Sequence, residues 1–277
     1  MRVVEELAVD AQLGLGPDFF EKQALAPAGV GDDEVGKLIC EGFRAELVDL
    51  LRIGIIPGGR SSVSYVMVDP QKGTRTKFPY RDSLPAICWD KEKKQAIASA
   101  KVLHLDGTQY ENALSAAKIA KENGILVSLD GCSMQKENEK NRALAAMSDI
   151  LIMNARYPYR VAGTDNLEDA LRYFGSLGPK TVISTAGSTG CAALLEGKII
   201  RFPSFPVKAV DTTGAGDVFH GAFLARTLEG ADTVECIRYA SAASALKCTQ
   251  IGGRAGIPTR AEVLHFLGQN SSWSPSM

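Results

Sequence analysis

Short apolar segments alternate with segments of helical periodicity from residue 100 onward, and this alternation restricts the fold more than any other feature. The apolar segments are AKVLHLDG, ILVSLDG, DILIMN and KTVISTAG, with patterns such as NALSAAKIAKENG and NLEDALRYFGSLG between them. Strands that alternate with helices form βαβ units, so we expect an α/β fold with a doubly wound, mostly parallel sheet flanked by helices. Ligands of such sheets bind beyond the carboxyl ends of the strands, where the sequence places Asp106, Asp130, Asn154 and Thr185.

Two segments depart from this alternation. Around residues 60–80, RSSVSYVMVDPQKGTRTKFPYR alternates with period two about a DPQKG turn, which predicts a β-hairpin. The hairpin is either a small lid on a single domain spanning residues 1–277 or a plain edge hairpin. The first 30 residues follow neither period, so we expect an atypical or truncated N-terminal strand region.

Composition excludes several classes of protein. The 277 residues carry a net charge of −1, so the basic excess typical of nucleic-acid-binding proteins is missing. No apolar run is long enough to span a membrane. Six cysteines are scattered without CxxC spacing, so buried reduced thiols are favoured over disulfides. Three histidines without metal-ligand spacing argue against zinc. We therefore expect a cytoplasmic protein whose partners are small molecules.

The stretch KAVDTTGAGDVFHGAFLA, which starts at residue 208, places two carboxylates around a glycine-rich turn. If KAV ends a strand and a helix starts at the glycines, the backbone amides of Gly214, Ala215 and Gly216 form an anion hole. Asp217 in the first helical turn is then placed to accept the proton of an attacking hydroxyl. Asp211 is left to bind a cation or to fix the loop. The alternative is an ordinary strand–turn–helix with an aspartate cap.

The whole string DTTGAGDVFHGAFLA resembles the C-terminal signature of the PfkB/ribokinase family of carbohydrate kinases. The segments VGDDEVGK, SSVSYVMVDPQKGTRT, TVISTAGSTGC and YASAASALKCTQIGGRAGIPTRAEV resemble further family segments in the same order. The resemblance covers residues 29–267. Sulfofructose kinase-like members are the nearest subgroup, with fructokinase-like and ketohexokinase-like members close by.

This resemblance implies a ribokinase-like fold and the ATP-dependent phosphorylation of a sugar hydroxyl. The acceptor is expected to be a ketose such as fructose or sulfofructose, and Mg²⁺ is expected as a cofactor, with K⁺ as a further candidate. Asp217 is implied as the general base, Asp106 and Asp217 as sugar contacts, and Asp211 and Thr213 as ligands of a monovalent cation. The implied nucleotide-binding residues are Asn154, Thr185, Gly187, Gly190, Ser241, Ser244, Gly252 and Gly253.

Plainer interpretations stay open for several of these positions. The segment from Thr185 to Gly190 could be a simple turn, and Ser241 and Ser244 could serve helix packing. His220 is expected to be a packed helical histidine, and Arg254 an exposed loop residue.

The sequence also departs from the family in two places. Asn154 lacks the acidic residue that usually follows it and helps to organise magnesium, and no Gly-Gly-x-x-x-Asn sugar motif precedes Val30. An alternative function is therefore a catalytically impaired module that binds nucleotide or protein. Lids in this family often dimerise, so a homodimer through the hairpin is also expected. A Rossmann oxidoreductase is disfavoured, because no strand–GxGxxG–helix unit opens the chain.

Overall fold

The computed structural model describes residues 29–46, 48, 50, 53–68, 75–80, 84–107, 109–132 and 136–276. The chain divides into two compact units. The first comprises Met1–Pro85 and Ser204–Trp273, and the second comprises Ala86–Pro203 and Ser274–Met277. The expected atypical N-terminal region lies outside the described residues, and the expected single domain stays a prediction.

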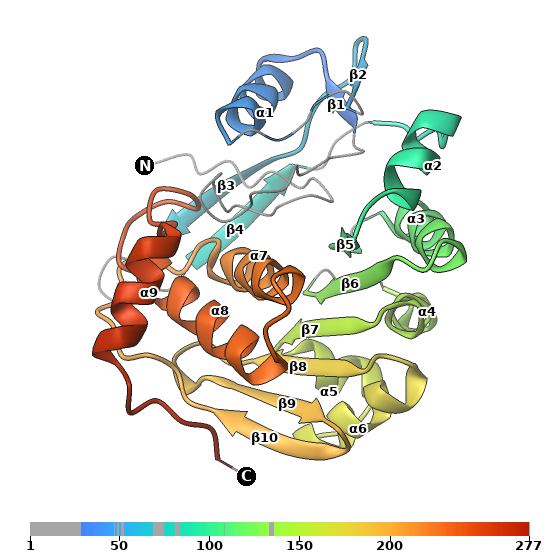
Figure 1. The fold of residues 1–277 in the computed structure, drawn as a ribbon. Coiled ribbons are helices and arrows are strands. Elements are labelled where there is room, and N and C mark those ends of the chain that lie inside the picture. Colours follow the sequence, from blue (N-terminus) through green and yellow to red (C-terminus); the bar gives the residue numbers. More distant parts are fainter. Residues whose placement is uncertain are drawn as a thin grey trace. The chain divides into compact units, whose positions relative to one another are not determined.

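The second unit is built on a six-stranded sheet (Figure 1), whose strand order is β10-β9-β8-β7-β6-β5. Strands β5 to β8 are parallel, whereas β9 pairs antiparallel with β8 and β10 antiparallel with β9. This confirms the predicted mostly parallel sheet. The strands are β5 (Val102–Leu105), β6 (Leu126–Gly131), β7 (Ile150–Asn154), β8 (Thr181–Thr185), β9 (Cys191–Leu195) and β10 (Lys198–Phe202).

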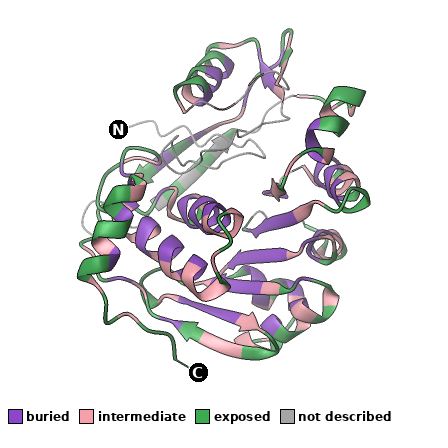
Figure 2. Cartoon of the chain, in the orientation of Figure 1, coloured by how far each residue is buried: buried purple, intermediate pink, exposed green. Residues whose placement is uncertain are grey.

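Helices connect the parallel strands of this sheet, as the periodicity predicts. Leu151 and Val182 on the strands and Phe174 on a helix are fully buried in one apolar cluster. The middle strands of the sheet are largely purple, the colour of buried residues, in Figure 2. Burial of such side chains is the main favourable term in folding, so this layer of helices stabilises the unit. The helices are α2 (Lys91–Ala98), α3 (Tyr110–Glu122), α4 (Asn138–Met147), α5 (Tyr157–Ala162) and α6 (Leu167–Leu177).

The described part of the first unit starts with a βαβ element made of β1 (Gly29–Gly31), α1 (Glu34–Ala45) and β2 (Gly54–Ile56), in which β1 and β2 are parallel. Asp33 caps α1 by accepting a hydrogen bond from the Gly36 N–H. Its carboxylate also accepts bonds from the amide and hydroxyl of Ser61, at 2.9 and 2.8 Å. The cap therefore ties the start of α1 to the segment that leads into the hairpin.

The predicted hairpin is confirmed as β3 (Val63–Val68) paired antiparallel with β4 (Arg75–Tyr80). Alternate residues face opposite sides of a strand. Val66 is 5% exposed, while Tyr65 and Met67 on the other face are 50% and 59% exposed. The DPQKG turn lies outside the described residues.

Three further helices of the first unit lie in the described residues, namely α7 (Ala215–Leu228), α8 (Thr233–Lys247) and α9 (Arg260–Gln269). None of the helices in the described part of the chain combines the length and the apolarity needed to cross a bilayer.

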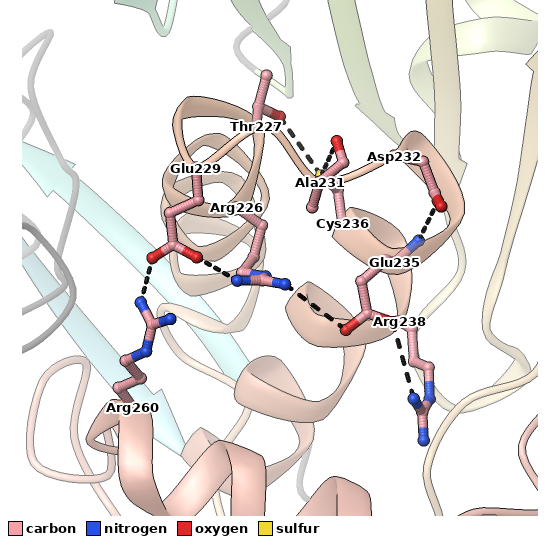
Figure 3. A network of polar contacts seen from close by, with 9 residues as sticks. All are labelled: Arg226, Thr227, Glu229, Ala231, Asp232, Glu235, Cys236, Arg238 and Arg260. Atoms are coloured by element: carbon pink, nitrogen blue, oxygen red, sulfur yellow. Dashed lines mark hydrogen bonds and ion pairs between the residues drawn. The ribbon is translucent and has the colours of Figure 1, made fainter.

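An ion-pair network joins these three helices beyond the C-terminal end of α7 (Figure 3). Glu229 pairs with both Arg226 and Arg260, so it links the end of α7 to the start of α9. Arg226 and Arg238 also lie 3.9 and 3.7 Å from Glu235 of α8. Burial raises the pKa of Glu229, but the two arginines outweigh it, so its pKa lies below the ordinary value.

This network predicts an acid-sensitive contribution to stability. A carboxyl group whose pKa is lower in the folded than in the unfolded state stabilises the fold at any pH above its unfolded-state pKa. This stabilisation is lost as the pH falls from the unfolded-state pKa through the folded-state pKa. We expect Glu229→Gln to lower the free energy of unfolding by about 0.5–1 kcal/mol at pH 7, since solvent screens the pairs. Urea unfolding from pH 7 to pH 3.5 should show the two proteins converging below pH 4.5. A constant difference, or an equal effect of Glu122→Gln at an exposed glutamate, would contradict this.

Candidate functional site

The glycine-rich turn and the first turn of α7 form the centre of the candidate site. Gly214 caps the helix with φ of 78°, a left-handed conformation that favours glycine. A Cβ at this position would also lie 2.6 Å from the Gly253 carbonyl oxygen. Position 214 therefore requires glycine, because its backbone is left-handed and because a side chain would collide with Gly253. The turn packs directly against the loop of Gly252 and Gly253.

The amide groups at the start of α7 are the ones predicted to form an anion hole, and the structure shows one of the three already bonded within the loop. In any helix the first N–H groups have no acceptor within the helix, and the macrodipole adds partial positive charge there. Of the three amides predicted for the hole, that of Ala215 donates to the Thr212 carbonyl at 3.2 Å. Gly216 is exposed and Asp217 is half-buried in the first helical turn. The structure thus places Asp217 in the same turn as these amides, and its role as a base stays a prediction.

Asp211 fixes the loop that leads into the turn. It is 1% exposed, and its two carboxylate oxygens accept hydrogen bonds from the amides of Thr213 and Gly252, at 2.8 and 2.9 Å. Burial raises its pKa, but these bonds and the charge of Lys247 outweigh burial, so the pKa lies below the ordinary value. Asp211 is therefore an ionised organiser of the loop.

The C-terminal end of α8 holds the same loop from a second side. The Cys248 carbonyl accepts hydrogen bonds from the amides of Val210 and Asp211, at 2.7 and 3.2 Å. Ser244 donates its hydroxyl to the Ala215 carbonyl at 2.8 Å, and Lys247 donates its ammonium to the Asp211 carbonyl at 3.0 Å. The turn is thus fixed by main-chain and side-chain contacts from α8.

One expectation about this segment is wrong. KAV does not end a strand, because residues 203–210 form neither a strand nor a helix. The backbone of this stretch instead meets the end of α8 through the Cys248 carbonyl. The helix itself begins at Ala215, which confirms the predicted start.

Sequence reasoning assigned no role to Lys247, although its side chain is fully buried beside the site. The available signal was a single lysine in the otherwise small and apolar run SAASALKC. Two plainer interpretations are supported. Ser244 serves helix packing, because its hydroxyl ties α8 to α7, and His220 is a packed helical histidine, because it is buried within α7. Arg254 is exposed, as its plainer interpretation has it.

Residues predicted from the second unit lie in loops that follow its strands. Thr185 ends β8 and donates its hydroxyl to the Met153 carbonyl, and Gly187 and Gly190 form the turn into β9 with φ of 57° and 93°. Asn154 ends β7, where its side-chain oxygen accepts from two following amides at 2.9 and 3.1 Å. Asp106 follows β5 and is half-buried. Their nucleotide and sugar contacts stay predictions.

Within the first unit, the structure brings most of the predicted residues together. Asp211, Thr213 and Gly252 share hydrogen bonds, Gly214 packs on Gly253, and Ser244 bonds to the helix that carries Asp217. Ser241 lies one turn before Ser244 on the same face of α8.

Comparison with known proteins identifies the family. The family described as pfkB family carbohydrate kinase matches residues 11–260. The chain belongs to this family. It is therefore a carbohydrate kinase, a phosphotransferase with an alcohol group as acceptor.

Individual relatives of this kinase agree with that assignment. Ribokinase from Haemophilus influenzae is 29% identical over 247 residues, covering 86% of this chain and 79% of the relative. Fructokinase-1 from Zea mays is 28% identical over 280 residues, covering 93% and 84%. The crystal structure of a putative ribokinase from Agrobacterium tumefaciens superposes with a TM-score of 0.85 at 27% identity, over 99% of this chain and 89% of that one. The kinase thus has the expected ribokinase-like fold.

Proposed function

We propose that this kinase transfers the terminal phosphoryl group of ATP to a sugar hydroxyl, with Asp217 as the general base. The observation that carries the proposal is the position of Asp217 in the first turn of α7, next to the amides that open the helix. A base must lie within hydrogen-bond reach of the hydroxyl that it deprotonates, and the helix fixes its carboxylate near the phosphoryl group. The attacking oxygen then displaces ADP in line.

The turn before Asp217 stabilises the charge that develops during transfer. The amides of Gly214 and Gly216 are proposed to contact the phosphoryl oxygens, which carry the negative charge of the transition state. The Ala215 amide is proposed to join them by giving up its 3.2 Å hydrogen bond to the Thr212 carbonyl. Preorganised donors are effective because they need no reorganisation at the moment of reaction. Clamping of the turn by Asp211, Ser244 and the Gly253 carbonyl supports that role.

Magnesium is proposed to accompany ATP. No group of three or more histidine, cysteine, aspartate or glutamate side chains able to hold a metal occurs among the residues that the structure describes. Mg²⁺ does not need such a group, because it keeps several waters and binds largely through substrate phosphates. The ion would supply charge neutralisation on the phosphates, while the chain supplies the amides and the base.

The proposed acceptor is a ketose such as fructose or sulfofructose, with Asp106 as a second sugar contact. Ribose is the main competitor, because relatives of both the ribokinase and fructokinase type match the chain. A coupled assay of ADP release should show one of these sugars raising turnover well above the ATPase background. If ribose is the preferred acceptor, the assignment of a ketose is wrong but the proposed kinase function stands. If no sugar raises turnover, both the acceptor and the proposed kinase function are contradicted.

The alternative of a non-catalytic nucleotide- or protein-binding module gains no support from the comparisons, because the relatives are named as kinases.

The hairpin is proposed to close over the sugar and to form a homodimer. One face exposes Tyr65 and Met67 on β3 and Phe78 and Tyr80 on β4, each between 46% and 59% exposed. Tyr65 is paired directly with Phe78, so these side chains form one apolar patch. Patches of this kind mark protein interfaces.

Light scattering tests this dimer. We expect the unmodified protein to be a dimer and Tyr65→Lys to be a monomer, because the substitution places a charge in the apolar interface. Leu264→Lys, at an exposed leucine of α9, is the control that should stay dimeric. A monomeric parent protein, or a dimer that tolerates Tyr65→Lys, would contradict the proposal.

A further inference from the structure

Lys247 is a buried cation with no role in the proposed chemical step. It is the last residue of α8 and is 0% exposed. Lysine is almost never fully buried without a partner, since removing an ammonium from water is costly. Its ammonium donates to the Asp211 carbonyl at 3.0 Å, inside the loop that precedes the anion hole.

This position coincides with the expected monovalent-cation site. The sequence resemblance assigns Asp211 and Thr213 to such an ion, and K⁺ in proteins is bound by rings of carbonyl oxygens. In the structure, however, the Asp211 carbonyl accepts from Lys247 and its carboxylate accepts from the amides of Thr213 and Gly252. A free cation here would also be repelled by the buried ammonium. Of the two predicted ligands, Asp211 is thus already engaged, and the Thr213 hydroxyl is buried without a hydrogen-bond partner. One hydroxyl beside a buried ammonium does not fit a bound K⁺.

We propose that the Lys247 ammonium replaces the monovalent cation beside the anion-hole loop, so that this kinase works without K⁺. The tethered charge holds the Asp211 carbonyl and, through the adjacent turn, the amides at the start of α7. Lys247 is thus a positioning residue. The inference rests on the proposed function only where turnover is measured, because ion binding and stability can be measured without substrate.

The plainer interpretation is that Lys247 merely complements the negative end of the α8 dipole, as lysines near helix C-termini do. The two interpretations differ in what truncation creates. If the ammonium replaces an ion, Lys247→Ala opens a space lined by the oxygens of Asp211 that a K⁺ ion can fill. If the charge only complements the dipole, added K⁺ has no specific effect on the variant.

Thermal unfolding in 100 mM KCl and in 100 mM choline chloride tests the proposal, with turnover in the same two salts as a second readout. We expect the parent protein and Lys198→Ala, a control at an exposed lysine, to have the same Tm in both. Lys247→Ala should have a lowered Tm in choline chloride, and KCl should raise it by about 2–6 °C through linkage. Its turnover should fall at least tenfold in choline chloride and recover in KCl.

Two results would overturn the proposal. One is a parent protein whose Tm rises in KCl relative to choline chloride. The other is a folded Lys247→Ala protein that gives the same Tm in both salts. If Lys247→Ala does not fold, the test rests on the parent protein, and equal Tm values of the parent in KCl and in choline chloride support the proposal. Failure of the kinase function would appear separately, as no turnover in either salt.

Discussion

Asp217→Asn is expected to lower kcat by ~10²–10⁴-fold, the range that a positioned general base contributes. Asparagine keeps the shape of the side chain in the first turn of α7 but cannot accept the proton of the sugar hydroxyl. The fold should be retained, since Asp217 is half-buried and the buried core of α7 is unchanged. Steady-state kinetics at saturating ATP and sugar, with Tm measured alongside, provide the test.

The matched control for this variant is Asp165→Asn, at an exposed aspartate of the second unit. It removes the same charge far along the chain from the anion-hole turn and should leave kcat unchanged. An Asp217→Asn protein that is as active as the control would remove Asp217 from the chemistry. A fall in kcat with a matching fall in Tm would instead assign it a structural role.

Gly214→Ala is expected to have the second large effect. Alanine at φ of 78° costs about 1–2 kcal/mol. Its Cβ would in addition lie 2.6 Å from the Gly253 carbonyl, and overpacking of this kind typically costs a further ~1–3 kcal/mol. Displacement of the turn would also move the amides away from the transferring phosphoryl group. We therefore expect a clear loss of stability by urea unfolding and a fall in kcat of at least ~10²-fold.

Gly230→Ala separates the backbone strain from the collision. Gly230 lies two residues beyond the other end of α7 and has φ of 84°, but a Cβ there meets nothing within 4 Å. It should lose only the ~1–2 kcal/mol of the left-handed conformation and keep its turnover. Equal stability losses in the two variants would show that the contact with Gly253 is unimportant.

The strands and the site helix could be predicted from local patterns. The four parallel strands are continuous apolar runs of the kind found in sheets that are buried on both faces, and their alternation with helical periodicity leaves little choice of fold. The start of α7 was predictable because the glycine-rich turn around Gly214 directly precedes a long apolar run. In both cases the information lies within a dozen neighbouring residues.

Strands β9 and β10 were not predicted, although a signal was present. They form a hairpin whose two-residue turn is Glu196–Gly197, with φ of 49° and 77°. Two left-handed residues define a type I′ turn, which is usually recognised from Asn-Gly or Asp-Gly. Glutamate is unusual at such a position, so the sequence EG between two apolar runs did not predict the turn.

The contacts that clamp the site could not be predicted from the sequence. Lys247 and Asp211 are 36 residues apart in the sequence. In the fold, however, the Lys247 ammonium lies only 3.0 Å from the Asp211 carbonyl oxygen. Helical periodicity indicates which face Lys247 occupies but not what its flexible side chain reaches. The segment KAV has the composition of a strand, yet tertiary contact with the Cys248 carbonyl determines its backbone.

Transfer of a radiolabelled γ-phosphate from ATP to a sugar tests the central claim most directly. The parent protein, Asp217→Asn and Asp165→Asn should be incubated with labelled ATP, Mg²⁺ and each of fructose, sulfofructose and ribose, and the products separated by charge. We predict label on a sugar phosphate for the parent and Asp165→Asn, and almost none for Asp217→Asn. Label released only as inorganic phosphate, or sugar phosphate formed equally by Asp217→Asn, would contradict the assignment of Asp217 as the base of a sugar kinase.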